Sequence, residues 1–211
     1  MAHQQGTSRQ ESVALVHFND EEARTVEALA ERIIPGDGDN AGATDAGVVY
    51  YIDQAIAGFS TDLQTVYRRG LRELDALCRR EHGAPFTDLD ADTQDDVVRR
   101  HLGPEILPAD SLQFGPSDQP GGAVLLRFFA VVREHTVEGF FCDPAYGGNR
   151  GAVGWKLVGF PGAHWGYTAE QMGPGVDARS IPIKTLSDLR SELPSLPPNE
   201  NFTRNEPKTE C

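Results

Sequence analysis

The sequence predicts an all-α fold: a compact helical domain of about five helices, a long loop rich in glycine and aromatic residues, and an extended proline-rich tail. Apolar residues recur at three- and four-residue steps through most of the first 140 positions, and the alternation typical of strands is scarce. The length of 211 residues suits one domain. A hydrophobic fraction of 39% is enough for one core.

The first helix is predicted from its start signal. Asn19, with Glu22 three residues later, has the spacing of a capping box. Apolar residues then follow on one face until Pro35 and Gly36 end the helix. The acidic stretch 37–40 lacks the distal glutamate of a calcium loop, so we interpret it as a turn.

The next two helices are predicted by serine, threonine and aspartate caps before apolar stripes. Thr44 and Asp45 are expected to cap a second helix that ends near Gly58. Ser60 or Thr61 is expected to cap a third helix, which continues to residues 82–83. Cys78 lies on the apolar stripe of that third helix and is expected to be buried.

A fourth helix is predicted over residues 92–102, and a loop from there to residue 122. The fifth helix, about 123–138, is the most apolar. Arg127, Glu134 and Glu138 form its only sustained polar stripe, so most of its circumference is expected to be buried.

The segment that follows the fifth helix combines glycines and aromatic rings without helix or strand periodicity. Both tryptophans of the protein, Trp155 and Trp165, lie in it. Glycine-rich turns allow close backbone approach and rings fill pockets, which is typical of a surface that docks another protein. The alternative is that the rings pack over the helices of the same chain.

The chain divides into three parts on this interpretation. Residues 1–17 form a polar lead, and residues 18–172 form the helical domain. Residues 173–211 form a tail whose prolines exclude long helices, and we expect it to be extended or disordered unless a partner orders it.

Composition excludes several classes of function. A net charge of -13 repels nucleic acid and anionic membranes. The longest apolar run, 123–132, is much shorter than the roughly 20 residues that span a bilayer. The polar N-terminus lacks a secretory signal, so a cytoplasmic location is expected. Three widely separated cysteines favour neither a disulfide framework nor a zinc site.

Residues that could carry catalysis are few. The histidines are scattered, with no pair at the spacing that holds a metal on a helix. His135 and Asp143 are the possible functional pair, and a structural role is the preferred interpretation of that histidine. Residues 147–149 lack the spacing of a dinucleotide-binding loop.

Several motifs in order resemble those of the gluconate 2-dehydrogenase subunit 3 family, over about residues 18–167. They are ALAERIIPG at 28–36, DAGV at 45–48, YID at 51–53, HTVEGFF at 135–141, DPAYGGN at 143–149 and GWKLVGFPG at 154–162. The resemblance implies a small non-catalytic subunit that binds no cofactor. Its partner would be a large FAD-dependent dehydrogenase of the glucose-methanol-choline type, which oxidises a sugar, sugar acid or glycoside. Some such complexes pass electrons to a cytochrome c subunit.

The resemblance also sets expectations for the interface and the location. The tail is a candidate to wrap the partner. Small subunits of this family often carry a twin-arginine signal, and none precedes Phe18. A periplasmic location would require that the signal was trimmed or lies on the partner. The alternatives are a chaperone or export escort for the flavoprotein, and an independent enzyme centred on His135 and Asp143. The partner-interface candidates are Phe140, Phe141, Tyr146, Asn149, Trp155, Phe160, Trp165 and Tyr167.

Overall fold

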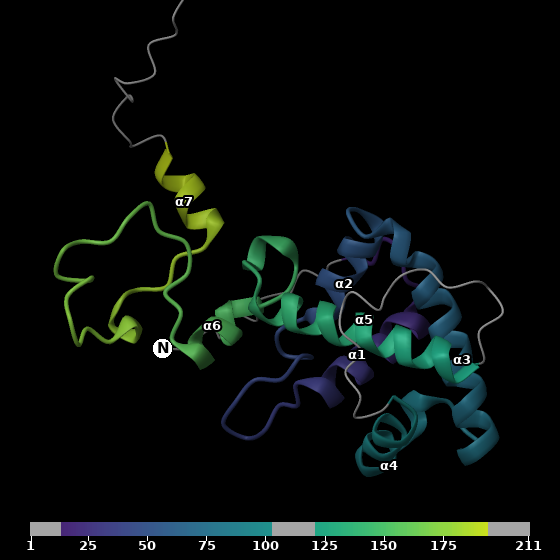
Figure 1. Ribbon diagram of the computed structural model, residues 1–211. Coiled ribbons are helices and arrows are strands. Elements are labelled where there is room, and N and C mark those ends of the chain that lie inside the picture. The colour runs from purple at the N-terminus through teal and green to yellow at the C-terminus, as the bar shows by residue number, and fades with distance from the viewer. Residues whose placement is uncertain (1–13, 103–120, 194–211) are drawn as a thin grey trace, which may run out of the picture.

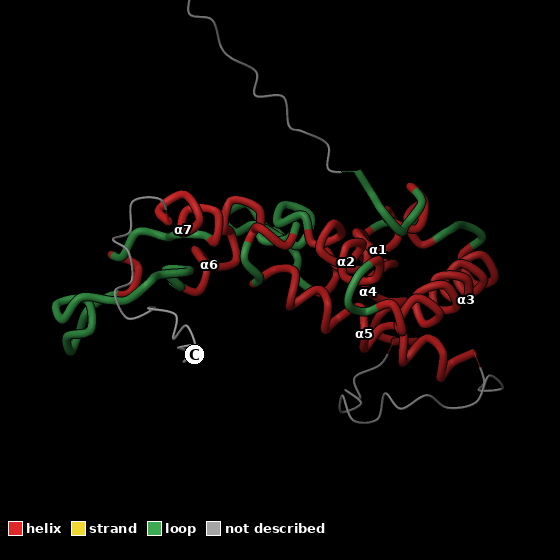
Figure 2. Tube along the Cα trace, turned by 90° about the horizontal axis from the view of Figure 1, so that it is seen from above, coloured by secondary structure: helices red, strands yellow, loops and turns green. Residues whose placement is uncertain are grey.

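The computed structural model describes residues 14–102 and 121–193, and within these ranges the protein is helical without a β-strand (Figures 1 and 2). The all-α prediction is confirmed. The α-helices are α1 Asp20–Ile33, α2 Val48–Ala57, α3 Gln64–His82, α4 Ala91–Val97, α5 Gly121–Phe141, α6 Val153–Val158 and α7 Leu186–Glu192.

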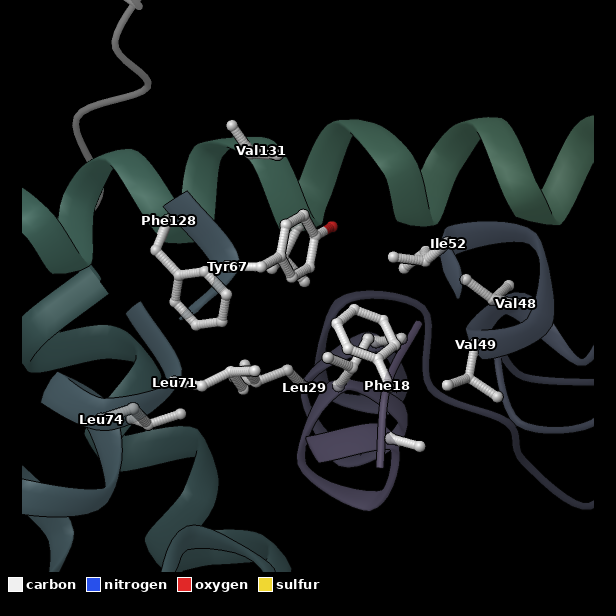
Figure 3. Packing of buried hydrophobic residues seen from close by; sticks show 14 of the residues in the cluster. Phe18, Leu29, Val48, Val49, Ile52, Tyr67, Leu71, Leu74, Phe128 and Val131 are labelled. Carbon is white, nitrogen blue, oxygen red and sulfur yellow. The ribbon is translucent and has the colours of Figure 1, made fainter. Parts of the chain in front are cut away.

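Helix α5 is the central element of a bundle with α1, α2 and α3, which all pack against it (Figure 1). Tyr67 of α3 and Phe128 of α5 are fully buried at the centre, with their rings edge to face at 5.6 Å (Figure 3). Gly70 leaves room for the ring of Phe128, because a Cβ at this position would lie 2.1 Å from that ring. The apolar periodicity of the sequence therefore corresponds to one shared core.

The capping prediction holds for α1. The side chain of Asn19 accepts the backbone N–H of Glu22 at 2.9 Å, and the Glu22 carboxylate accepts the N–H of Asn19 at 3.1 Å. The capping prediction for α2 is wrong. Gly47, with a φ of 66°, precedes that helix, and the Asp45 carboxylate accepts the N–H of Gly42.

The predicted cap of α3 is also wrong. A 3₁₀ turn, Thr61–Leu63, precedes the helix, and Ser60 makes no side-chain cap. Helix α4 starts one residue before the predicted position, with Asp90 as its cap, and continues as a π-helical turn, Val98–Leu102. Cys78 is fully buried, as expected.

The segment before α1 is fixed to the bundle by a buried carboxylate. Asp53 of α2 is only 1% exposed, and it accepts the backbone N–H groups of Val16, His17 and Phe18 at 2.6 to 2.9 Å. Val16 and His17 of the polar lead are therefore held in place, and residues 1–13 lie outside the described residues.

The second half of the chain is more helical than predicted. Helix α5 continues three residues past the expected end, and the expected glycine-rich loop contains α6. Residues 173–193 of the expected tail contain no long helix, in line with their prolines, but they include the seven-residue helix α7. The predicted loop over 103–120 and the rest of the tail, 194–211, lie outside the described residues.

Residues 143–193, which we name the lobe, follow the carboxyl end of α5. The lobe contains α6 and α7 and lies beyond the end of the bundle, on the side away from α3 and α4 (Figures 1 and 2). None of the helices in the described ranges has the length and apolarity needed to cross a membrane.

Candidate partner interface

The lobe is joined to the carboxyl end of α5 by two side chains. The last carbonyl groups of a helix have no partner within the helix and need other donors. The indole N–H of Trp155 donates to the carbonyl of Phe141 at 2.7 Å. The side chain of Asn149 donates to the carbonyl of Cys142 at 2.8 Å and accepts the backbone N–H of Gly154 at 2.8 Å. Together they dock the start of α6 onto α5.

Two glycines make this docking possible by allowing backbone to lie against backbone. A Cβ at Gly148 would lie 2.1 Å from the carbonyl oxygen of Gly139. A Cβ at Gly154 would lie 2.1 Å from the carbonyl oxygen of Phe140. Both distances are far too short for any side chain, so these two glycines serve close packing.

The two ends of the lobe are also tied together. One oxygen of Asp143 accepts the N–H of Ala145 at 2.9 Å, and the other accepts the N–H of Leu186 at 2.8 Å. Lys184 donates its N–H to the carbonyl of Pro161 at 3.0 Å and accepts from Ala163 at 2.7 Å. The start of α7 is therefore fixed beside the junction with α5.

The two candidate catalytic residues have structural partners. His135 is 4% exposed, stacks on Tyr67, and its Nδ1 lies 3.0 Å from the Tyr67 hydroxyl. Burial lowers the pKa of His135 below its usual value. Asp143 uses both of its carboxylate oxygens on backbone N–H groups. Among the described residues, no cluster of three histidine, cysteine or acidic side chains is placed to hold a metal.

The candidate interface residues separate into a buried and an exposed group. Phe140, Asn149 and Trp155 are enclosed within the chain's own fold, with exposures of 0%, 0% and 5%. The exposed group consists of Phe141, Tyr146, Phe160, Trp165 and Tyr167. The buried residues hold the lobe in place. Four of the exposed rings lie on the lobe, and Phe141 lies at the end of α5.

Sequence reasoning missed further exposed apolar residues near these rings. Apart from Val16, Phe59 and Leu193, every large hydrophobic side chain exposed in the described part of the chain lies between residues 137 and 176. The missed residues are Val137, Leu157, Val158, Met172 and Val176. Helical spacing would have found Leu157 and Val158 if α6 had been predicted. Large apolar side chains that stay exposed in one part of a chain are candidates for contact with another protein.

The lobe also differs from the rest of the chain in charge. The whole chain has a net charge of -13, whereas the charges of the lobe balance. Its basic residues are Arg150, Lys156, Arg179, Lys184 and Arg190, and its acidic residues are Asp143, Glu170, Asp177, Asp188 and Glu192. The acidic excess of the chain therefore lies outside the lobe.

The protein is a helical bundle with a lobe that has no net charge and carries exposed aromatic rings. These features place it in the class of small proteins that are suited to binding another protein. Comparison with known families gives the particular family. The profile of gluconate 2-dehydrogenase subunit 3 matches residues 20–162, and the chain belongs to this family of accessory subunits of a multi-subunit dehydrogenase. The match covers the bundle and α6 and ends before the rings of Trp165 and Tyr167. No curated protein and no solved structure matches the chain.

Proposed function

We propose that this chain is the non-catalytic small subunit that binds and stabilises a large FAD-dependent dehydrogenase of the glucose-methanol-choline type. That partner would hold the flavin and oxidise a sugar, sugar acid or glycoside. In complexes that include a cytochrome c subunit, the flavin would pass its electrons to it. The observation that carries the proposal is the concentration of exposed apolar side chains between residues 137 and 176.

The arrangement of the lobe supports this role. Phe160, Trp165 and Tyr167 have exposures of 46%, 58% and 40%, although large rings are usually buried. Tryptophan and tyrosine are enriched among the residues that contribute most to protein–protein binding. The backbone beneath Phe160 is held through Trp155, so this ring does not need to be ordered when a partner binds.

Co-expression with a flavoprotein of the glucose-methanol-choline type, sought among the genes that neighbour the gene for this chain, tests the proposal. We expect the two proteins to co-purify at fixed stoichiometry with a flavin spectrum, and the soluble activity of the flavoprotein to rise. The purified chain alone should be colourless and inactive. Substrate turnover by the chain alone, or a flavoprotein indifferent to its presence, would overturn the proposal. Transient binding lost on size exclusion would favour an export escort or chaperone instead.

A single exposed ring can test the surface itself. We expect Trp165→Ala to weaken the complex by about 2 kcal/mol or more, which is roughly 30-fold in Kd. Because Trp165 is exposed, the free energy of unfolding of the isolated chain should change by less than about 0.5 kcal/mol. Titration calorimetry against the purified flavoprotein gives the Kd.

The matched control is Phe59→Ala. Phe59 is also a solvent-facing ring, 72% exposed, and it follows α2 in the bundle. Phe59→Ala should leave the Kd of the complex unchanged. Equal losses for the two variants would contradict the assignment of the interface to the lobe.

A further inference from the structure

A small pocket lies on the surface of the lobe, between α6 and the segment 178–183. The pocket has a volume of about 150 Å³. Trp155 and Ile181 line it and are themselves buried, and Phe160 lines it while remaining 46% exposed. An apolar cavity of about this volume accommodates a group the size of a benzene ring. The pocket is therefore large enough for one leucine or phenylalanine side chain.

The walls of the pocket are fixed by contacts within the lobe. Trp155 is held by its hydrogen bond to Phe141, and the ring of Phe160 packs edge to face on it at 5.3 Å. Gly162, with a φ of 81°, lies against Trp155, where a Cβ would be 2.7 Å from the indole ring. The bridge between Gly162 and Lys184 holds the opposite wall. The pocket thus exists before anything binds.

Two cations lie at the rim of the pocket. Lys156 and Arg179 both line it and are exposed. Neither takes part in any ion pair within residues 14–102 and 121–193. The nearest acidic residue in sequence, Asp177, accepts the backbone N–H of Arg179 with its side chain. The rim therefore attracts a carboxylate that comes from outside the lobe.

We propose that this pocket takes one apolar side chain of the flavoprotein, from a surface segment that carries a carboxylate beside it. The apolar group would fill the space over Trp155, and the carboxylate would pair with Lys156 and Arg179. The inference rests on the proposed function and adds the docking point and the chemistry of the segment that binds there. A second copy of this chain is a poorer occupant. The acidic surface of one copy would have to bind the basic rim of the next copy. Contacts between two different surfaces give rings or open chains and not a closed dimer.

Two variants test the pocket by different means. Ala178 lines the pocket and is exposed, so Ala178→Phe should block the space without removing a group. Arg179→Glu should repel the carboxylate. In titrations against the purified flavoprotein we expect the first change to raise the Kd about 30-fold or more and the second about 10-fold. Raising the salt concentration should weaken the wild-type complex more than the Arg179→Glu complex.

Matched controls lie on α3 in the bundle. Ala76→Phe and Arg68→Glu make the same changes at exposed positions there and should leave the Kd unchanged. Circular dichroism checks that all four variants fold.

The possible failures are distinguishable. A complex that forms with wild-type affinity in both the Ala178→Phe and Arg179→Glu variants would overturn the pocket and leave the proposed function standing. A wild-type chain that forms no complex would overturn the proposed function. A chain that forms a dimer on its own, lost in Ala178→Phe, would assign the pocket to self-association and overturn the inference.

Discussion

Trp155 contributes both a ring and a hydrogen-bond donor to the junction between α5 and the lobe. Trp155→Phe keeps most of the ring but leaves the carbonyl of Phe141 without its donor. We expect a loss of about 1–2 kcal/mol in the free energy of unfolding. Trp155→Ala should lose about 3–5 kcal/mol, because it also opens a cavity. Urea unfolding followed by circular dichroism measures both values.

The exposed tryptophan is the control for this experiment. Trp165 is 58% exposed, so Trp165→Phe should change the free energy of unfolding by less than about 0.5 kcal/mol. If Trp155→Phe cost no more than Trp165→Phe, the indole hydrogen bond would have no structural importance.

His135 should make the stability of the fold depend on pH. Burial lowers its pKa in the folded protein, whereas the unfolded chain has the ordinary value of about 6.5. Below that value the unfolded chain binds more protons, so the free energy of unfolding should fall as the pH drops. The fall should continue until the pH reaches the lowered pKa of the folded state, with a slope of up to about 1.4 kcal/mol per pH unit.

Removing the imidazole tests this dependence. His135→Gln should give a flatter stability profile between about pH 7 and pH 5, measured by urea unfolding at a series of pH values. The exposed His82 provides a control, and His82→Gln should retain the wild-type slope. Identical profiles for the wild type and His135→Gln would show that another group titrates.

Phe140 and Phe141 show the limit of residue type as a predictor. Both were candidates for the interface, yet Phe140 is fully buried and Phe141 is 36% exposed. Successive residues on a helix point about 100° apart, so neighbours can face opposite environments. The predicted end of the fifth helix at residue 138 left both rings in a loop, where no face could be assigned.

At the scale of elements, a local signal predicted the start of α1, whereas the local signals proposed for α2 and α3 failed and α6 had none. The cap of α1 needs only Asn19 and Glu22, three residues apart. Ahead of α2, the carboxylate of Glu31 accepts the N–H of Thr44 from thirteen positions earlier in the chain, a contact that no short motif indicates. Helix α6 is preceded by Gly151 and Ala152, both at positive φ, a backbone conformation that no helix-start signal indicates.

Gly154 is the point at which α6 contacts the backbone of α5. Gly154→Ala would place a methyl group 2.1 Å from the carbonyl oxygen of Phe140 if nothing moved. Because the neighbour is backbone, α6 must shift, and we expect a loss of about 1–3 kcal/mol in the free energy of unfolding. Thermal unfolding together with hydrogen exchange of α6 measures the effect.

The control for this change is Gly166→Ala. A Cβ at Gly166 meets no heavy atom within 4 Å, and that glycine is not at positive φ. The substitution should therefore leave stability within about 0.5 kcal/mol of the wild type. Equal effects of the two alanines would refute the close packing of α6 on α5.

At the scale of the whole molecule, the bundle was predictable and the lobe was only partly so. The bundle follows from the periodic apolar stripes that converge on Tyr67 and Phe128. The lobe has no such stripe, and its shape depends on hydrogen bonds between distant residues such as Asp143 and Leu186. The resemblance to the gluconate 2-dehydrogenase subunit 3 family was confirmed over residues 20–162. The acidic and basic residues of the lobe could be counted, and their equal numbers recognised, only once the boundaries of the lobe were known.

Helix α5 runs without a break from the core around Phe128 to the junction at Phe141. A hinge between bundle and lobe would have to break hydrogen bonds of that helix or pull Trp155 from its acceptor. The start of α6 is therefore held at a fixed orientation on α5 once the chain has folded. A partner would bind a lobe that already has its final orientation, so association does not have to order this junction.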